Sequence, residues 1–194
     1  MIGDIITIVH NPLVQLYMVY FETIVGSGAE MYELPEEVKD KLKLYFPPTL
    51  LERVRYGSSH HTSTENTAMT DCTDIYFPAG NGIVKLLKNN QIFTRVPDSK
   101  SPCSYLYWGK LHWLIHELYH TLQCVEEGGR PNYATRWFGE LPVATIEKLI
   151  TSPRTVSMNK IHDSMFMEER AESYADEVLY ERLCNCTMVD NECQ

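Results

Sequence analysis

The stretch that decides the fold is WLIHELYHTLQCVEEGG, Trp113 to Gly129. Two histidines, His116 and His120, lie four residues apart, and Glu117 directly follows the first of them. Residues four apart on a helix share one face, with Cβ atoms about 5–6 Å apart. Apolar residues recur between these polar ones, and the stretch ends at two glycines, a common helix stop. It therefore predicts one long helix that presents two imidazoles on a single face.

The spacing of these three residues also predicts a chemistry. Two imidazoles one helical turn apart can bind one zinc ion, at Zn–N distances of about 2.0–2.1 Å. Glu117 is rotated by about 100° from His116, because an α-helix has about 3.6 residues per turn. It cannot easily share the metal, but it can take a proton from an activated water and pass it to a leaving amine. The pattern H-E-x-x-H thus predicts His116 and His120 as zinc ligands and Glu117 as the catalytic base.

A second interpretation of the same helix needs no metal. His112, His116, His120 and Cys124 form one stripe at a spacing of four residues. Such a stripe is also compatible with a histidine-rich interface inside a helical protein. A third ligand would decide between the two interpretations.

The third ligand must come from outside this stretch. The longer pattern H-E-x-x-H-x-x-G-x-x-H fails, since Gln123 replaces the glycine and Glu126 the histidine. A glutamate from a later helix is the usual alternative, giving a His₂Glu site. The last helix reads MEERAESYADEV, and helical spacing brings four of its residues onto one face: Glu168, Ala171, Glu172 and Ala175. Small alanines let this helix approach the histidine helix closely, so that a glutamate beside them can reach the metal.

These motifs together resemble those of gluzincin-type metallopeptidases. Glu168-x-x-Ala171-x-x-Tyr174-Ala175 is similar to the glutamate helix of ImmA/IrrE-type peptidases, which implies Glu168 as the third zinc ligand. Glu172-Ser173-Tyr174-Ala175-Asp176 also fits the E-x-x-A-D signature of a family of membrane-embedded gluzincins, which implies Glu172 instead. We take Glu168 as the third ligand, because the spacing of the following alanine and aromatic residue fits better, and keep Glu172 as the second choice.

Residues 50–125 resemble a bacterial family of zinc peptidases that is known chiefly as an uncharacterised domain. The family pattern is a Val-Arg strand, an alanine-threonine step, an Ile-x-Phe strand and H-E-L-x-H with a glutamine three residues on. The matching residues are Val54, Arg55, Ala68, Thr70, Ile75, Phe77, His116, Glu117, Leu118, His120 and Gln123. This chain departs from the pattern near Asp71-Cys72, where the family has a glycine, and in a long segment between Phe77 and His116.

The bulk composition is that of a folded globular chain. Its 194 residues suit a single domain, which can bury a core without structural metal. Hydrophobic residues make up 44% and charged residues 22% of the sequence. The net charge is −9 and there is no basic stripe, so we expect no nucleic-acid partner. No apolar run is long enough to cross a bilayer, so we expect no membrane span.

The six cysteines favour an oxidising compartment. They are Cys72, Cys103, Cys124, Cys184, Cys186 and Cys193. A cluster of three near residue 190 is more typical of a stapled tail than of cytosolic thiols, so we favour a secreted or periplasmic location over the cytoplasm. Residues 1–26 lack a basic start and make a poor signal peptide. Cys103 and Cys124, about 30 Å apart on one helix, cannot pair, and we expect Cys124 to pair with a tail cysteine.

The order of elements predicts an α+β fold of one zincin-like domain. We expect N-terminal helices in residues 1–50, a small, mostly antiparallel sheet in 51–100 and the catalytic helices in 101–194. Four short runs predict the strands: ERVRYG (52–57), DIYFPAG (74–80), GIVKLL (82–87) and QIFTRV (91–96). The predicted helices are residues 12–25, 35–46, 101–127, 141–152 and 162–184. Ser101 should cap the motif helix, with Pro102 at its first position.

The sequence thus predicts a zinc-dependent metallopeptidase with one zinc ion per chain. Its substrate would be a peptide or protein, bound by strand addition along DIYFP or QIFTR. Tyr174, His162 and Arg170 are candidates for stabilising the oxyanion, and the sequence does not choose between them. The alternatives are a catalytically silent zincin-fold binding module and a metal-free helical scaffold. The oligomeric state cannot be read from the sequence.

Overall fold

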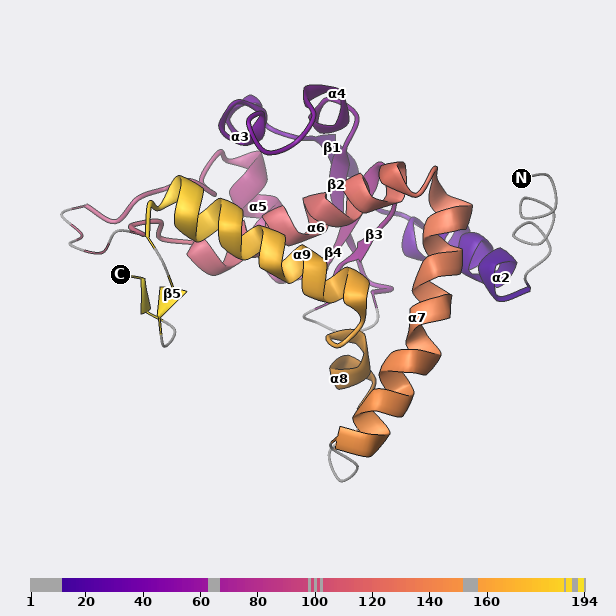
Figure 1. The fold of residues 1–194 in the computed structure, drawn as a ribbon. Helices are drawn as coiled ribbons and strands as arrows, with labels where there is room; N and C mark the ends of the chain where they lie inside the picture. The colour runs from indigo at the N-terminus through magenta and orange to yellow at the C-terminus, as the bar shows by residue number, and fades with distance from the viewer. Residues whose placement is uncertain are drawn as a thin grey trace.

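The protein folds into helices packed around a small mixed sheet, as the computed structural model shows (Figure 1). The structure describes residues 12–62, 67–97, 99, 101, 103–151, 157–186, 188–189 and 192–193. The α+β class predicted from the sequence is therefore confirmed. Among the described residues, no helix has the length and apolar character needed to cross a membrane.

The first half of the chain contributes short helices. They are α2 (Pro12–Tyr20), the π-helix η1 (Phe21–Val25), α3 (Glu36–Leu42), α4 (Pro48–Leu51) and α5 (Ile83–Lys88). Prolines set two of the helix starts, since Pro35 directly precedes α3 and Pro48 is the first residue of α4. The continuous helix expected over residues 12–25 is present as α2 followed by η1.

The sheet has four strands in the order β1-β2-β4-β3 within the described residues. They are β1 (Met31–Glu33), β2 (Arg55–Ser59), β3 (Met69–Thr70) and β4 (Asp74–Pro78). Two of the three pairings are antiparallel, whereas the central pair, β2 with β4, is parallel. Gly57 of β2 lies against β1 so closely that an added Cβ would stand 2.7 Å from the Glu30 carbonyl oxygen.

The second half of the chain supplies the long helices. They are α6 (Trp108–Glu126), α7 (Arg130–Thr151), α8 (Met158–His162), α9 (Phe166–Asp176) and the π-helix η3 (Glu177–Leu183), followed by the small hairpin of β5 (Met188–Val189) and β6 (Glu192–Cys193). The motif helix α6 ends at the predicted glycines, which adopt φ values of 84° and 112°. Helix α7 reaches away from the body of the molecule (Figure 1).

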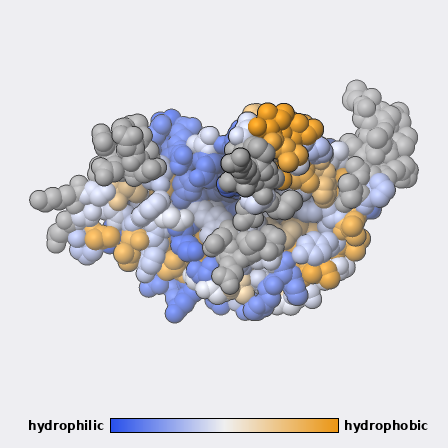
Figure 2. Space-filling model, turned by 90° about the horizontal axis from the view of Figure 1, so that it is seen from below, coloured by the Kyte–Doolittle hydropathy of each residue, from blue (hydrophilic) through white to orange (hydrophobic). Residues whose placement is uncertain are grey.

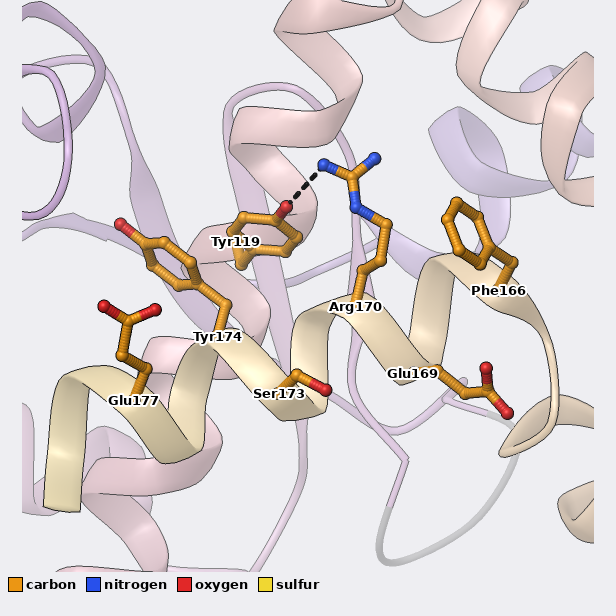
Figure 3. Close-up of a pocket in the computed structure, with 7 residues that line it drawn as sticks. All are labelled: Tyr119, Phe166, Glu169, Arg170, Ser173, Tyr174 and Glu177. Atoms are coloured by element: carbon orange, nitrogen blue, oxygen red, sulfur yellow. Dashed lines mark hydrogen bonds between the residues drawn. The ribbon is translucent and has the colours of Figure 1, made fainter. Parts of the chain in front are cut away.

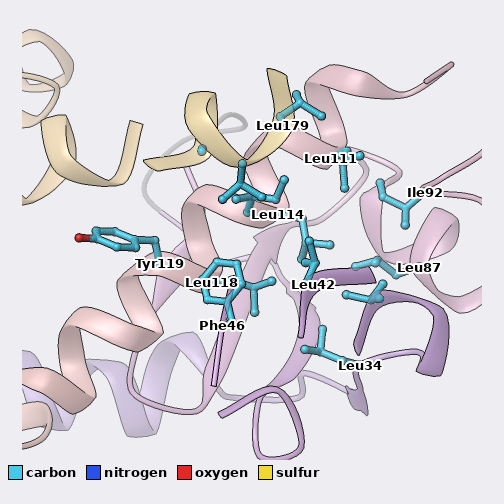
Figure 4. Close-up of a cluster of buried hydrophobic side chains, with 14 of the residues drawn as sticks. Leu34, Leu42, Phe46, Leu87, Ile92, Leu111, Leu114, Leu118, Tyr119 and Leu179 are labelled. Atoms are coloured by element: carbon cyan, nitrogen blue, oxygen red, sulfur yellow. The ribbon is translucent and has the colours of Figure 1, made fainter. Parts of the chain in front are cut away.

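Helix α6 lies between the sheet and helix α9, and this arrangement positions the site (Figure 1). Its apolar face, which includes Leu111, Leu114 and Leu118, is fully buried in the main hydrophobic cluster (Figure 4). On the α9 side, Ala171 and Ala175 are also fully buried, as expected for residues that allow close approach of two helices. The face of α6 that carries the histidines is therefore turned toward α9.

Within the part of the chain that the structure describes, two disulfides connect residues far apart in the sequence. Cys72 bonds to Cys124, and Cys103 bonds to Cys184. The prediction that Cys124 pairs with a tail cysteine is wrong, because the turn between β3 and β4 brings Cys72 to the end of α6. It is Cys103 that pairs with a tail cysteine, and Cys103 and Cys124 do not bond to each other, as predicted. Disulfides are typical of proteins in an oxidising compartment.

Several predicted boundaries are wrong. GIVKLL forms helix α5 and not a strand, while Arg95 of QIFTRV makes only an isolated bridge to Tyr105. Strand β1 lies within the segment 1–50 that was expected to be purely helical. Helix α6 begins at Trp108, seven residues after the expected cap at Ser101. The expected last helix is interrupted, since α8 ends at His162 and α9 begins at Phe166.

Candidate metal centre

Helices α6 and α9 face each other with a row of histidines opposite a row of carboxylates. His120 contacts Glu168, His116 contacts Glu168 and Glu172, and His112 contacts Glu172 and Asp176. This order of contacts shows that the two helices run antiparallel. Each row repeats every four residues, so one register of helix packing aligns both rows.

Three donor atoms of this seam converge on one point. The Nε2 atoms of His116 and His120 are 3.0 Å apart, and Glu168 Oε2 lies 3.3 Å from the first and 3.2 Å from the second. In a tetrahedral zinc site with bonds of about 2.0–2.1 Å, neighbouring ligand atoms are about 3.3 Å apart. The triangle therefore has the dimensions of three ligands around one ion. It is one of two groups among the described residues that could hold a metal.

The other nitrogen of His120 fixes the direction of its lone pair. Gln123 donates from Nε2 to the backbone carbonyl of Met167, at 3.0 Å, which leaves its Oε1 atom to accept. His120 Nδ1 lies 2.8 Å from that oxygen and must be the donor, so Nδ1 carries a hydrogen. In a neutral imidazole, Nε2 is then the unprotonated nitrogen that a metal requires.

The same argument applies to His116. Its Nδ1 atom lies 3.2 Å from Glu172 Oε2, and an ionised carboxylate can only accept. Neutral His116 would therefore also carry its hydrogen on Nδ1 and direct a lone pair from Nε2. Two lone pairs and a carboxylate oxygen within 3.3 Å of one another repel unless a cation lies among them. Glu172 thus orients the His116 ring through Nδ1, whereas Glu168 completes the triangle.

Protons on the two histidines can also supply the positive charge that the triangle requires. Burial lowers the pKa of His116, but the hydrogen bonds to Glu168 and Glu172 outweigh it and raise the pKa to about 10. The pKa of His120 is also raised, because Glu168 outweighs the effect of burial. Burial raises the pKa of Glu168, yet the two histidines hold it well below its ordinary value. A divalent ion at the centre would compete with these protons.

Glu117 lies outside the triangle and is held by two donors. Its Oε1 atom accepts from Trp113 Nε1 at 3.0 Å, and its Oε2 atom accepts from the hydroxyl of Thr70 on the edge strand β3. Glu117 is only 5% exposed, so both hydrogen bonds lie in a largely dry environment. Each carboxylate oxygen keeps a free lone pair, with which Glu117 can accept a proton.

Of the three oxyanion candidates, only His162 reaches the triangle. Its Nε2 atom lies 3.2 Å from Glu168 Oε1, the oxygen that faces away from the other two histidines. Arg170 instead donates to the hydroxyl of Tyr119, and Tyr174 stacks on that ring and donates to the Tyr45 carbonyl oxygen.

Tyr133 of α7, buried beside His120, is a further phenol near the site. Burial and the charge of Glu168 raise its pKa well above the ordinary value, so it stays protonated.

A cavity beside α9 is separate from the candidate metal centre. It is open and about 380 Å³ in volume, and its lining residues are Tyr119, Phe166, Glu169, Arg170, Ser173, Tyr174 and Glu177 (Figure 3). These α9 residues lie on the opposite side of the helix from Glu168 and Glu172. Neither ligand carboxylate candidate of α9, Glu168 or Glu172, lines this cavity. Seen from below, the molecule is hollowed near its centre, and hydrophilic residues line the hollow (Figure 2).

Sequence patterns predicted the three residues of the triangle but gave no role to Gln123, Trp113 and Thr70, which hold His120 and Glu117 in place. Gln123 and Trp113 lie three residues after His120 and four residues before Glu117, so helical spacing alone could have indicated them. Thr70 was noted only as part of a family resemblance, without a role. Its contact with Glu117 depends on where β3 packs, which no local pattern specifies.

Comparison of the chain with family models, with curated proteins and with solved structures found no match.

Proposed function

We propose that this protein is a zinc-dependent metallopeptidase that hydrolyses peptide bonds with an activated water molecule. The observation that carries the proposal is the triangle of His116 Nε2, His120 Nε2 and Glu168 Oε2, with edges of 3.0 to 3.3 Å. Glu117 supports it further, because this buried carboxylate lies beside the ligands without belonging to them. A purely structural metal site would not need such a group.

In this proposal the residues of the chain divide the work. His116, His120 and Glu168 hold one zinc ion, which when bound supplies Lewis-acid activation of water and of the scissile carbonyl. Glu117 takes the proton from the attacking water and gives it to the leaving amine. Thr70 and Trp113 hold Glu117 in place for that transfer. His162 and Tyr133 are the nearby donors that can stabilise the developing oxyanion.

The proposed substrate is a peptide or protein bound in extended form. DIYFP or QIFTR was expected to bind it by strand addition. DIYFP is not available, because β4 is buried and pairs with β2 on one side and β3 on the other. QIFTR does not form a strand, since its Arg95 makes only an isolated bridge to Tyr105. The edge next to the candidate centre is β3, whose Thr70 contacts Glu117. We therefore assign the role of substrate-binding strand to β3, from which main-chain hydrogen bonds would lead the substrate past Glu117.

The Cys72–Cys124 and Cys103–Cys184 disulfides support a site of action outside the cytoplasm, in a secreted or periplasmic setting. The competing functions are a zinc-binding module without catalysis and a metal-free helical scaffold. The second of these gives no role to the convergence of three potential ligand atoms on one point, nor to the buried Glu117 beside them. We therefore rank it below both metal-binding functions.

Glu117→Gln is the variant that tests the proposal. It should keep one zinc ion per chain and lose at least about 100-fold in peptidase activity, because it removes the proton acceptor and leaves the ligands intact. Metal content is measured by elemental analysis, and activity with an unfolded protein substrate. The matched control is Glu126→Gln, an exposed glutamate on the same helix, which should change neither quantity.

Each competing function gives a different result in this experiment. Zinc binding by the wild type without cleavage of any unfolded substrate would establish a silent binding module. Wild-type protein that holds no zinc after incubation with the ion would establish a metal-free scaffold. Full activity of Glu117→Gln would show that another base acts.

A further inference from the structure

A second group of ligand atoms lies one helical turn along the same seam. His112 Nε2 is 3.0 Å from Asp176 Oδ1 and 3.9 Å from Glu172 Oε1. One ligand atom from each of these three residues lies within 4.8 Å of the other two. The side chain of His112 is 14% exposed, whereas those of Glu172 and Asp176 are 60% and 53% exposed. The group therefore has one partly buried imidazole and opens to solvent on its acidic side.

The two carboxylates of this group would repel each other without a positive charge between them. Glu172 and Asp176 stand four residues apart on α9, a spacing at which like charges are unfavourable. The imidazole of His112 reaches both of them. A metal ion among the three would offset this repulsion and use every donor of the group.

The chemistry of the donors selects the kind of ion. Calcium and magnesium prefer sites built from oxygen atoms alone, whereas imidazole suits zinc and its neighbours among the transition metals. One imidazole with two carboxylates therefore fits zinc, with water filling the remaining positions. Such a site has fewer nitrogen ligands and is more exposed to solvent than the triangle of His116, His120 and Glu168. It should therefore bind zinc more weakly.

Glu172 joins the two groups. Its Oε2 atom accepts from His116 Nδ1 at 3.2 Å, while its Oε1 atom faces His112. A carboxylate can serve both partners at once, one with each oxygen. An ion bound at Oε1 would withdraw negative charge from the hydrogen bond that supports His116. Occupation of the second group would therefore weaken the hold of His116 on its own metal.

We propose that His112, Glu172 and Asp176 form a second, weaker zinc site that shares Glu172 with the catalytic centre. The second site stands on its own ligands. Its role as a regulator of the first, by which excess zinc loosens the catalytic ion, rests on the proposed function.

Zinc titration by equilibrium dialysis, with elemental analysis of the bound metal, tests this proposal. The wild type should bind one zinc ion tightly and a second at least about 100-fold more weakly. Asp176→Asn removes the negative charge of an exposed ligand without changing the size of the side chain. It should abolish binding of the second zinc ion and leave binding of the first unchanged. His112→Gln should do the same. Glu169→Gln, an exposed carboxylate on another face of α9, is the matched control and should leave both steps unchanged.

A third variant tests the sharing of Glu172. Glu172→Gln should abolish the weak step and also weaken the tight one about 10–100-fold, the usual effect of losing a partner behind a ligand. If the wild type binds only one zinc ion, tightly, and Asp176→Asn binds it equally well, the second site is overturned and the proposed function is unaffected. No zinc binding in the wild type would overturn both. Circular dichroism checks that each variant is folded.

Discussion

The oxygen that completes the triangle belongs to Glu168, and this makes a prediction at the scale of one residue. Glu168→Gln removes a ligand charge, whereas Glu172→Gln removes only the acceptor behind His116. We expect Glu168→Gln to lose nearly all tightly bound zinc and Glu172→Gln to lose about 10–100-fold in affinity. Competition with a zinc-sensitive dye measures both. The opposite order of effects would transfer the ligand role to Glu172 and its E-x-x-A-D motif.

Thr70 carries the second prediction at this scale. Thr70→Val keeps the shape of the side chain and removes the hydroxyl that donates to Glu117. Because the base is then less firmly held, kcat should fall about 10–100-fold while zinc content stays at one per chain. Thr135→Val removes an exposed hydroxyl that bonds only to its own helix and serves as the control. Unchanged kcat in Thr70→Val would mean that Trp113 alone positions Glu117.

For single residues, the sequence predicted the candidate site residues within one helix, but few of the contacts between different helices and strands. His116, Glu117 and His120 follow from spacing within α6. Helical spacing put both Glu168 and Glu172 on the face of the alanines, and the preference for Glu168 came from a family resemblance. His162 could be predicted only as one of three candidates, because the break between α8 and α9 turns it toward Glu168. Contacts across elements need the packed structure, since they depend on register as well as periodicity.

Among the elements, the turn between β3 and β4 is fastened to the end of α6 by the Cys72–Cys124 disulfide. The two cysteines are 52 residues apart, so Cys72→Ala/Cys124→Ala should lower the free energy of unfolding by about 2–4 kcal/mol. Zinc affinity should fall as well, because Gln123, whose side chain orients His120, directly precedes Cys124. Urea denaturation and zinc competition are the measurements.

The other disulfide provides the control for this change. Cys103→Ala/Cys184→Ala breaks a bond between residues 81 apart and should lower stability by a similar amount. It should leave zinc affinity unaltered, because neither cysteine adjoins a residue of the centre. Equal losses of zinc affinity in both double variants would show that general destabilisation, rather than the turn at Cys72, is responsible.

The errors in predicting elements have local causes. GIVKLL is apolar and short, and periodicity cannot separate a buried strand from a helix of that length. Gly82, with a φ of 84°, leads into the helix there. The motif helix begins late because Cys103 is tied to Cys184 and Tyr105 bridges Arg95. These ties across the molecule override the helix-start signal at Ser101.

For the whole molecule, metal and protons compete, and stability should depend on pH accordingly. The pKa of His116 rises from about 6.5 in the unfolded chain to about 10 in the metal-free fold. Its proton therefore stabilises that fold fully below about pH 6.5, and this contribution is lost as the pH rises toward about 10. A zinc ion displaces the proton, so zinc affinity should increase over the same window.

Thermal unfolding measures this linkage. The difference in Tm between zinc-loaded and chelator-treated protein should be larger at about pH 9 than at about pH 6.5. His116→Gln, which removes the titrating group, should abolish the difference at both values. A difference that shrinks as the pH rises would contradict the assignment of His116 as a ligand.

The separation of the three ligands along the chain has a consequence for biosynthesis. Glu168 follows His120 by 48 residues, and helices α7 and α8 come between them. A ribosome therefore completes the histidine helix, and with it the base Glu117, well before the third ligand exists. The centre cannot close on a nascent chain until α9 has emerged and packed against α6. In the proposed peptidase, that order of synthesis would delay activity until the whole domain has been made.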